Sequence, residues 1–210
     1  MSQRIIGITG GIATGKTMVS DYLHQTYGLP ILDADVYARE AVQGEILNQI
    51  IQRYGTEILD NSQTIESNQP PSLNRQKLGA IIFQDATERK WLESLIHPYV
   101  RDRFHTTVKQ YQPNTLVMVI PLLFEAKLQN LVTEIWVVAC DLNLELERLM
   151  QRNRLSAEEA KLRIQSQMPL SEKVLLADVV LENNGTSAEL FEQVDNALFN
   201  SIHGFSVALS

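Results

Sequence analysis

The sequence lacks most features that mark secreted and membrane proteins. Its 210 residues include one cysteine, Cys140, so no intramolecular disulfide can form, which fits a reducing compartment such as the cytosol. The apolar run near the amino terminus, RIIGITG, is short and broken by glycine, unlike a signal peptide. No apolar run approaches the roughly 20 residues that a membrane-spanning helix needs. We therefore expect a cytoplasmic protein with no membrane partner.

The chain also lacks an excess of positive charge. It has 25 Asp and Glu against 18 Lys and Arg, a net charge of −7, whereas general nucleic-acid binders usually carry a basic surface. We therefore expect no nucleic-acid partner, although a local basic pocket is compatible with this charge. With 44% apolar and 20% charged residues, the composition is that of a globular domain with a sizeable core.

Short apolar runs alternate with segments of helical periodicity. Strands are predicted at residues 4–9, 29–35, 115–120, 134–140 and 178–183. Helices are predicted at residues 16–27, 36–55, 76–96 and 142–154, with further helices after Ser156 and Thr186. Such alternation predicts an α/β fold whose parallel sheet is covered on both faces. The polar segment 61–72 is expected to form a loop or short hairpin, and the tail 205–210 to be disordered.

Local signals refine the helix boundaries. Ser156 with Glu159, and Thr186 with Glu189, have the spacing of a capping box, which marks the start of a helix. Leu190, Val194, Ala197 and Leu198 then form the inward stripe of a C-terminal helix. The pair His97-Pro98 is expected to interrupt or kink the helix before it. No repeat or long linker divides the chain, so we predict a single domain.

The strongest motif is GGIATGKT at residues 10–17. It fits G-x-x-x-x-G-K-[ST] in full, between a predicted strand and a predicted helix. Glycines let the backbone curl around an anion, so that N–H groups point at phosphate oxygens, and the following helix adds its positive dipole end. Lys16 would then reach the β- and γ-phosphates, and the Thr17 hydroxyl would hold Mg²⁺. The alternative is a glycine-rich turn without a ligand, which the full match in this context disfavours.

A phosphate loop indicates a nucleoside triphosphate but leaves three classes of protein in competition. A switch GTPase normally carries N-K-x-D, which is absent from this sequence. ATPase motors usually need longer chains, and no hydrophobic strand here ends in the single aspartate typical of their metal site. The length of 210 residues therefore favours a small-molecule kinase that uses ATP.

Asp33 and Asp35 flank one alanine directly after the second apolar run. If that run is a strand, both carboxylates lie at its carboxyl end, where doubly wound sheets bind ligands. A kinase that phosphorylates a hydroxyl needs a base near the acceptor oxygen. One carboxylate would orient or deprotonate that hydroxyl, and the other would bind Mg²⁺ directly or through water. A solvated strand end with an N-cap aspartate is the alternative.

Several motifs together resemble the dephospho-CoA kinase family. They are GITGGIATGKT, LDADVYAR, HPYV, VIPLLFE, ERLMQRNRLSAEEAKLRIQSQMPLSEK and ADVVLENNG, in the order and spacing of that family. The resemblance covers residues 4–202, and the DAD-x-x-AR and PLLFE segments are specific to the family. It implies ATP-dependent phosphorylation of the ribose 3′-hydroxyl of dephospho-CoA, the last step of coenzyme A synthesis.

The resemblance also implies an organisation of the chain. The fold would be that of a P-loop kinase with a five-stranded parallel sheet flanked by helices. Its core would comprise residues 1–35, 111–147 and 171–202. A helical subdomain at about 36–110 would bind the acceptor, and a lid at about 148–170 would close over ATP.

Roles on the donor side follow from the same resemblance. Asp35 would be the catalytic base, with Asp33 as the partner of the metal or of a water. Arg152 would be the lid arginine that contacts the phosphates, with Arg148 and Arg163 as further candidates, because a guanidinium fork matches phosphate geometry. A solvated helix face, with Glu159 and Arg163 paired, is the alternative. The nucleotide-binding set is Gly10, Gly11, Ile12, Ala13, Thr14, Gly15, Lys16, Thr17, Arg148 and Asn183.

Two of these positions carry open questions. Asn183 follows the last strand, where related kinases hold the adenine, but a plain turn explains it equally well. The family usually has glycine and serine where this chain has Ala13 and Thr14, so Ala13 is mildly costly if the loop needs a positive φ there.

The residues expected to bind the acceptor are Asp33, Arg39, His97, Glu125 and Arg163. Arg39 follows the aspartates by one helical turn and would meet the pyrophosphate of dephospho-CoA or pair with Asp35; a structural salt bridge is equally open. His97 is a candidate substrate contact, with a buried or capping histidine as the alternative. Glu125 is expected to end a strand run through residues 121–124, where its carboxylate would hydrogen-bond the acceptor.

Two rival functions remain at this point. One is a nucleoside or nucleoside-monophosphate kinase on the same scaffold, and the other is a non-catalytic nucleotide-binding protein. The sequence does not determine the oligomeric state, and we expect a monomer or a weak homo-oligomer.

Overall fold

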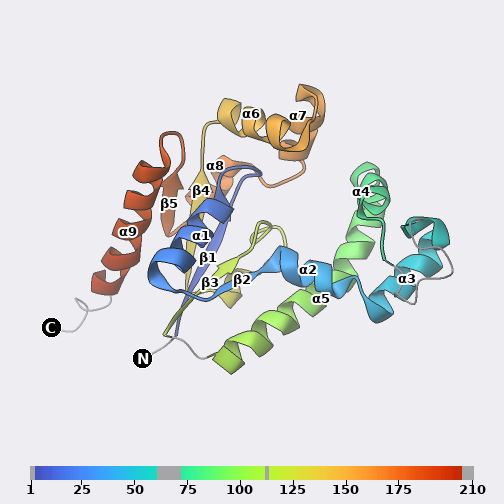
Figure 1. Cartoon of the computed structure of the whole chain (residues 1–210), viewed down its shortest axis with the longest axis horizontal. Helices are drawn as coiled ribbons and strands as arrows, with labels where there is room; N and C mark the ends of the chain where they lie inside the picture. The colour runs from blue at the N-terminus through green and yellow to red at the C-terminus, as the bar shows by residue number, and fades with distance from the viewer. Residues whose placement is uncertain (1–2, 61–71, 112–113, 205–210) are drawn as a thin grey trace. The chain divides into compact units, whose positions relative to one another are not determined.

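The computed structural model describes residues 3–60, 72–111 and 114–204 (Figure 1). The predicted tail at 205–210 and nearly all of the predicted loop at 61–72 lie outside these residues. The chain divides into two compact units, Met1–Asp33 with Gln112–Ser210, and Ala34–Tyr111. The first division falls inside the DAD motif, between Asp33 and Ala34.

The first unit is built on a five-stranded sheet with the order β2-β3-β1-β4-β5. All neighbouring strands are parallel, so their carboxyl ends meet at one edge. The fold class predicted from the sequence, an α/β fold with a five-stranded parallel sheet, is confirmed. The strands are β1 (Arg4–Gly10), β2 (Ile31–Asp33), β3 (Thr115–Val119), β4 (Glu134–Ala139) and β5 (Val179–Glu182).

Helices α1 (Lys16–Tyr27) and α9 (Ser187–Gly204) pack on one face of the sheet (Figure 1). The predicted inward stripe of α9 faces this core. Burying each large aliphatic side chain contributes about 1.5–3 kcal/mol, so this layer holds the sheet together. The core residues include Ile6, Ile8, Val19, Leu23, Val117, Trp136, Val138, Leu190 and Val194.

Beyond β4 the first unit continues with α6 (Leu142–Asn153), α7 (Ala157–Gln165) and α8 (Leu170–Leu175). Both predicted capping boxes are present. The Ser156 hydroxyl accepts from the Glu159 amide at 3.2 Å, and the Thr186 hydroxyl accepts from the Glu189 amide at 3.3 Å. Helix α8 was not predicted, because six residues are too few to show a hydrophobic period.

The short 3-10 helix Gln129–Leu131 completes the described elements of the first unit.

The second unit is helical. Its elements are α2 (Ala34–Ala41), α3 (Gly44–Tyr54), the 3-10 helix Thr56–Ile58, α4 (Arg75–Gln84) and α5 (Ala86–Tyr111).

The two helical segments predicted in this unit are confirmed as helical, but each is divided into two helices. The helix expected at 36–55 is interrupted before Gly44, whose φ of 57° is a left-handed conformation that breaks helical hydrogen bonding. The helix expected at 76–96 is interrupted at Asp85, whose carboxylate accepts from the Thr87 amide at 2.7 Å and so caps the start of α5.

Of the interruption or kink expected at His97-Pro98, the interruption does not occur, because α5 continues through Pro98 to Tyr111. A proline inside a helix costs about 3 kcal/mol through the lost hydrogen bond and ring clash. Burial of Leu92, Val100 and Phe104 along the same helix offsets this cost.

The second strand is shorter than predicted. It spans Ile31–Asp33 rather than 29–35, and α2 begins at Ala34. Asp35 therefore lies in the first turn of a helix, where a carboxylate is favoured by the helix dipole, and not on the strand. Only Asp33 occupies the strand end.

A charged cluster joins α3 to α5 in the second unit. The Glu88 carboxylate accepts from Arg53 Nε at 2.6 Å and Nη2 at 2.7 Å, and from the Tyr54 hydroxyl. These bonds, with that of Arg53 the largest cause, lower the pKa of Glu88 from 4.5 to about 2.

We predict that Glu88→Gln lowers stability at pH 7 and that the difference from the wild type narrows as pH falls from 4.5 toward about 2. A carboxylate with a lowered pKa in the folded state stabilises above its unfolded pKa, and the contribution is lost as it becomes protonated. Urea unfolding across this pH range measures the difference. Glu93→Gln, whose pair with Arg89 spans 4.0 Å, is the control. A pH-independent difference for Glu88→Gln contradicts the assignment.

Candidate active site

The loop between β1 and α1 forms a cradle of backbone around an open space. Gly10, Ala13 and Gly15 all have positive φ, at 146°, 60° and 107°. Helix α1 begins at Lys16 and no side chain caps it, so its first N–H groups are available to an anion. The Lys16 ammonium donates to the Gly11 carbonyl at 2.5 Å. The loop therefore fits the phosphate-binding role predicted from its sequence.

Two of the loop glycines are required for steric reasons. A Cβ atom at Gly10 would collide with the Val138 carbonyl of β4, and one at Gly15 would collide with the Asn183 side-chain amide. Both residues also have a left-handed φ that favours glycine. No larger residue can occupy these positions without moving the loop.

Asn183 braces this loop from behind. Its side chain is 3% exposed, and its Nδ2 donates to the Thr14 carbonyl at 2.8 Å. Its backbone amide donates to the Ala139 carbonyl at 2.7 Å, which fixes it at the carboxyl ends of β4 and β5. The Asn183 side chain therefore lies against the backbone of the phosphate loop.

Glu145, in the first turn of α6, is a second brace that sequence reasoning missed. It is 2% exposed, and its carboxylate hydrogen-bonds the Ile12 backbone. Burial raises the pKa of Glu145, while Lys16, the Ile12 backbone and Lys173 act to lower it. In the sequence, Glu145 is a carboxylate in the first turn of a predicted amphipathic helix, where most such residues are solvated. No neighbouring residue in the sequence indicates that it is buried.

Glu125 was predicted to end a strand, and this is wrong. Strand β3 stops at Val119, and residues 121–127 form turns, because Pro121 has no N–H to continue the ladder. The Glu125 carboxylate pairs with Lys173 at 2.9 Å and accepts from the Met168 amide at 3.0 Å. Lys173, another residue missed from the sequence, is fully buried.

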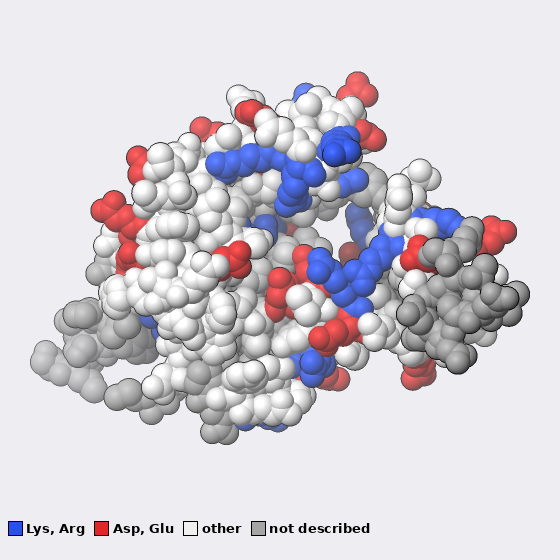
Figure 2. Space-filling view, in the orientation of Figure 1, with Lys and Arg blue, Asp and Glu red and all other residues white. Residues whose placement is uncertain are grey.

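The candidate lid arginines lie on or beside α6 and α7, where Lys and Arg side chains gather in the space-filling view (Figure 2). Arg152 is exposed, and its Nε donates to Asn153 at 2.9 Å. Arg148 is half-buried beside Cys140; its Nη1 is buried with no hydrogen-bond partner among the described residues. Arg163 lies in the last turn of α7.

Asp33 ends β2, and its Cα is paired with that of Val119 on β3. It therefore lies at the same edge of the sheet from which the phosphate loop departs. Asp35 and Arg39 lie in the first and last turns of α2, which belongs to the second unit. His97 lies on α5 in the same unit.

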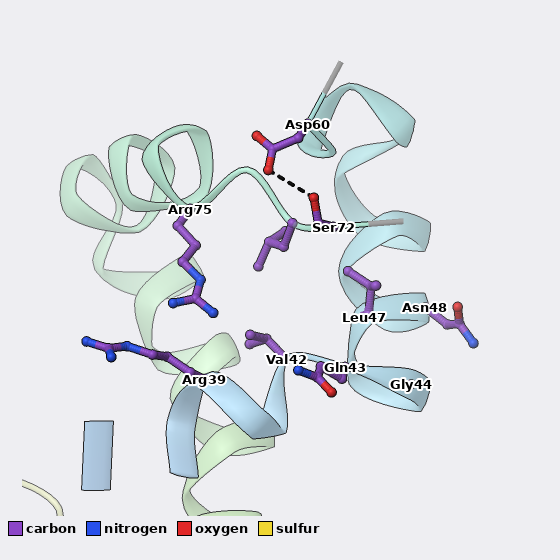
Figure 3. Close-up of a pocket in the computed structure, with 10 residues that line it drawn as sticks. Arg39, Val42, Gln43, Gly44, Leu47, Asn48, Asp60, Ser72 and Arg75 are labelled. Atoms are coloured by element: carbon purple, nitrogen blue, oxygen red, sulfur yellow. Dashed lines mark hydrogen bonds between the residues drawn. The ribbon is translucent and has the colours of Figure 1, made fainter. Parts of the chain in front are cut away.

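The second unit contains a pocket of about 730 Å³. Arg39 from α2 and Arg75 from α4 both line it. The Arg39 side chain points away from Val42 and Gln43 (Figure 3). Neither arginine makes an ion pair or side-chain hydrogen bond with another described residue, and His97 does not line the pocket. The remaining lining residues are Val42, Gln43, Gly44, Leu47, Asn48, Asp60, Ser72 and Leu73.

Among the residues that the structure describes, no group of three or more His, Cys, Asp or Glu side chains is arranged to hold a metal ion. Within residues 3–60, 72–111 and 114–204, no helix is both long and apolar enough to cross a membrane.

The dephospho-CoA kinase family model matches residues 4–189. The chain belongs to the dephospho-CoA kinase family. The dephospho-CoA kinase of Trichormus variabilis is 56% identical over 200 residues, which cover 94% of this chain and 98% of that relative. The family predicted from the motifs is therefore confirmed.

Solved structures agree with this membership in the dephospho-CoA kinase family. A Thermus thermophilus protein is 31% identical with a TM-score of 0.77, over 97% of this chain and 98% of the other. The dephospho-CoA kinase of Campylobacter jejuni is 25% identical with a TM-score of 0.67, over 97% and 99%.

We predict that Ala13→Gly raises the free energy of unfolding by about 0.5–1 kcal/mol. The left-handed conformation penalises a residue with a Cβ by roughly 1–2 kcal/mol, and greater freedom of glycine in the unfolded chain offsets part of the gain. Urea denaturation measures the change. The control, Ala197→Gly inside α9, lowers stability by about 0.5–1 kcal/mol. A loss of stability in Ala13→Gly contradicts the assigned backbone conformation.

Proposed function

We propose that this chain transfers the γ-phosphate of ATP to the 3′-hydroxyl of the ribose of dephospho-CoA, giving ADP and coenzyme A. The observation that carries the proposal is the braced phosphate loop in a chain that matches the dephospho-CoA kinase family over residues 4–189. No observed feature favours a nucleoside kinase or a non-catalytic nucleotide-binding protein.

On the donor side, the loop residues 10–17 hold the ATP phosphates through backbone N–H groups, with Lys16 as the mobile cation. Thr17 and Asp33 are oxygen donors of the kind that Mg²⁺ prefers. When bound there with the nucleotide, Mg²⁺ neutralises charge on the phosphate oxygens. The exposed Thr17 hydroxyl at the start of α1 is compatible with this role.

The lid arginines complete the donor side. Arg152 is exposed and within reach of solvent, so its guanidinium is free to turn from Asn153 toward phosphate oxygens as charge builds on them. Arg148 offers a buried Nη1 without a described partner. Arg163 is the third candidate of this group. Closure of such a segment also excludes water and suppresses ATP hydrolysis.

On the acceptor side, Asp35 is the proposed base, and Asp33 orients the metal or a water. Arg39 and Arg75 are proposed to bind the pyrophosphate of dephospho-CoA, because both line one pocket and neither makes an ion pair or side-chain hydrogen bond with another described residue. Val42, Leu47 and Leu73 offer apolar surface to the pantetheine arm. His97 stays a candidate substrate contact, whereas Glu125 is already engaged by Lys173 and Met168.

We further propose that the protein works in the cytoplasm as a monomer or weak homo-oligomer and without a nucleic-acid partner. The net charge of −7 and the single cysteine support this setting.

The proposed activity predicts ADP release from Mg·ATP only when dephospho-CoA is present, with AMP and adenosine run in parallel as alternative acceptors. Removal of Mg²⁺ with a chelator abolishes the release. Turnover with AMP or adenosine instead contradicts the proposed acceptor. Tight ATP binding without any acceptor-dependent ADP contradicts catalysis altogether.

The same assay separates the two aspartates. Asp35→Asn is expected to lower kcat by about 10²-fold or more, as expected for loss of a general base, and to leave ATP affinity nearly unchanged. Asp33→Asn is expected to raise the Mg²⁺ requirement. Near-normal turnover by Asp35→Asn, together with an inactive Asp33→Asn, reverses the two roles.

The pocket of the second unit gives a separate prediction. Arg75→Ala raises KM for dephospho-CoA by roughly tenfold, the effect of about 1.4 kcal/mol, and leaves KM for ATP nearly unchanged. Steady-state kinetics with each substrate varied in turn measures the split. Arg101→Ala, an exposed arginine of the same unit that does not line the pocket, is the control. Equal KM changes in both variants count against a phosphate-binding pocket.

A further inference from the structure

Lys173 is a buried charge that none of the roles above uses. It lies on α8 with a side chain that is 0% exposed. Its ammonium has three acceptors, the Glu125 carboxylate at 2.9 Å, the Pro121 carbonyl at 3.2 Å and the Gly10 carbonyl at 3.4 Å. Three acceptors match the three N–H donors of a lysine. Burying an ammonium costs several kcal/mol before such pairing, so an apolar side chain would fill this space at less cost.

The carbonyls that Lys173 binds lie at the edge of the sheet that carries the phosphate loop. Gly10 is the last residue of β1 and the first of the loop, and Pro121 follows shortly after β3. The Thr9 hydroxyl also donates to the Pro121 carbonyl, at 3.1 Å. Lys173 therefore links the two strand ends next to the loop.

The hydrogen bond from Lys173 to the Gly10 carbonyl affects the direction in which the next N–H group of the loop points. In a trans peptide the C=O and the following N–H point in opposite directions. Attraction of the Gly10 oxygen toward Lys173 therefore turns the Gly11 N–H to the other side of the same peptide plane. This peptide is the first of the loop, so its orientation affects each N–H group that follows.

The ion pair between Lys173 and Glu125 also involves the chain that follows α7. The same carboxylate oxygen that pairs with Lys173 accepts from the Met168 amide at 3.0 Å. Met168 lies between α7 and α8. One ion pair, whose lysine is buried, thus connects the start of the phosphate loop to the segment between α7 and α8.

We infer that Lys173 is a positioning residue of the donor site, whose charge orients the first peptide of the phosphate loop and anchors the chain after α7 to the same point. The inference rests on the proposed function only in that the loop binds ATP, and it requires no particular acceptor. Lys173 touches no reacting atom; it acts through Gly10 and Glu125.

The test is Mg·ATP affinity measured by calorimetry without any acceptor, on wild type, Lys173→Met and Arg4→Met. Arg4 is a matched control, because it pairs with Glu134 at 2.6 Å at the amino-terminal end of the same sheet. Each variant loses one ion pair of this sheet, so both lose stability. Only Lys173→Met is expected to weaken ATP binding, by about tenfold or more.

The possible outcomes separate this inference from the proposed function. A wild type that does not bind ATP removes the proposed function itself. A Lys173→Met variant that binds ATP as tightly as the wild type, although its Tm has fallen, shows that the lysine serves stability alone and overturns the inference.

Glu125→Gln decides the question if Lys173→Met does not fold. The glutamine oxygen still accepts from the Met168 amide, but the ion pair is lost. Weakened ATP binding in this variant supports the inference, and wild-type affinity overturns it. Where Lys173→Met folds, the double variant should bind ATP no more weakly than Lys173→Met alone, because both changes remove one interaction. Additive losses contradict a shared role.

Discussion

The donor site depends on one constraint: the backbone of the phosphate loop must keep an open conformation around the position of the bound phosphates. Without other partners, the N–H and C=O groups of such a loop would hydrogen-bond one another. Three buried side chains prevent this by binding the side of the loop that faces the protein. Asn183 holds the Thr14 carbonyl, Glu145 holds the Ile12 backbone, and Lys173 approaches the Gly10 carbonyl. Because these groups are engaged from behind, the remaining N–H groups are directed into the cradle.

The braces come from different parts of the sheet edge, which explains why the fold matters to the chemistry. Asn183 follows β5, Glu145 lies on the helix after β4, and Lys173 lies on α8. The loop itself follows β1, the central strand of the order β2-β3-β1-β4-β5. A parallel sheet brings all these chain segments to one edge, so that groups more than a hundred residues apart in the sequence meet around the phosphate loop. Two of the braces carry opposite charges, and Lys173 acts to lower the pKa of Glu145, which burial raises.

The sequence predicted those features that depend on local pattern. The loop motif, both capping boxes and the parallel sheet follow from short-range spacing. The features it missed depend on distant partners. Nothing near Lys173 or Glu145 in the chain shows that each is buried against the loop. Asp35 was predicted to lie on the strand. Helix α2 follows β2 directly, without a loop between them, so no turn residue in the sequence marks the end of the strand. Gly44, through its left-handed backbone, and Asp85, through its cap on α5, each divide a segment that was predicted as one run of helix. Both residue types are visible in the sequence, but the prediction did not use them as helix breaks.

We propose that the phosphate loop holds its binding conformation before any nucleotide binds. Amide hydrogen exchange of the wild-type protein without nucleotide tests this proposal most directly, with the loop at residues 10–17 compared with the flanking strand and helix. We expect the Ile12 amide, whose hydrogen bond to Glu145 acts to lower the pKa of that carboxyl, to exchange far more slowly than an amide of the unfolded chain. We expect little additional slowing of Ile12 exchange when Mg·ATP is added. An Ile12 amide that exchanges at the unfolded rate until ATP binds would contradict a preformed loop.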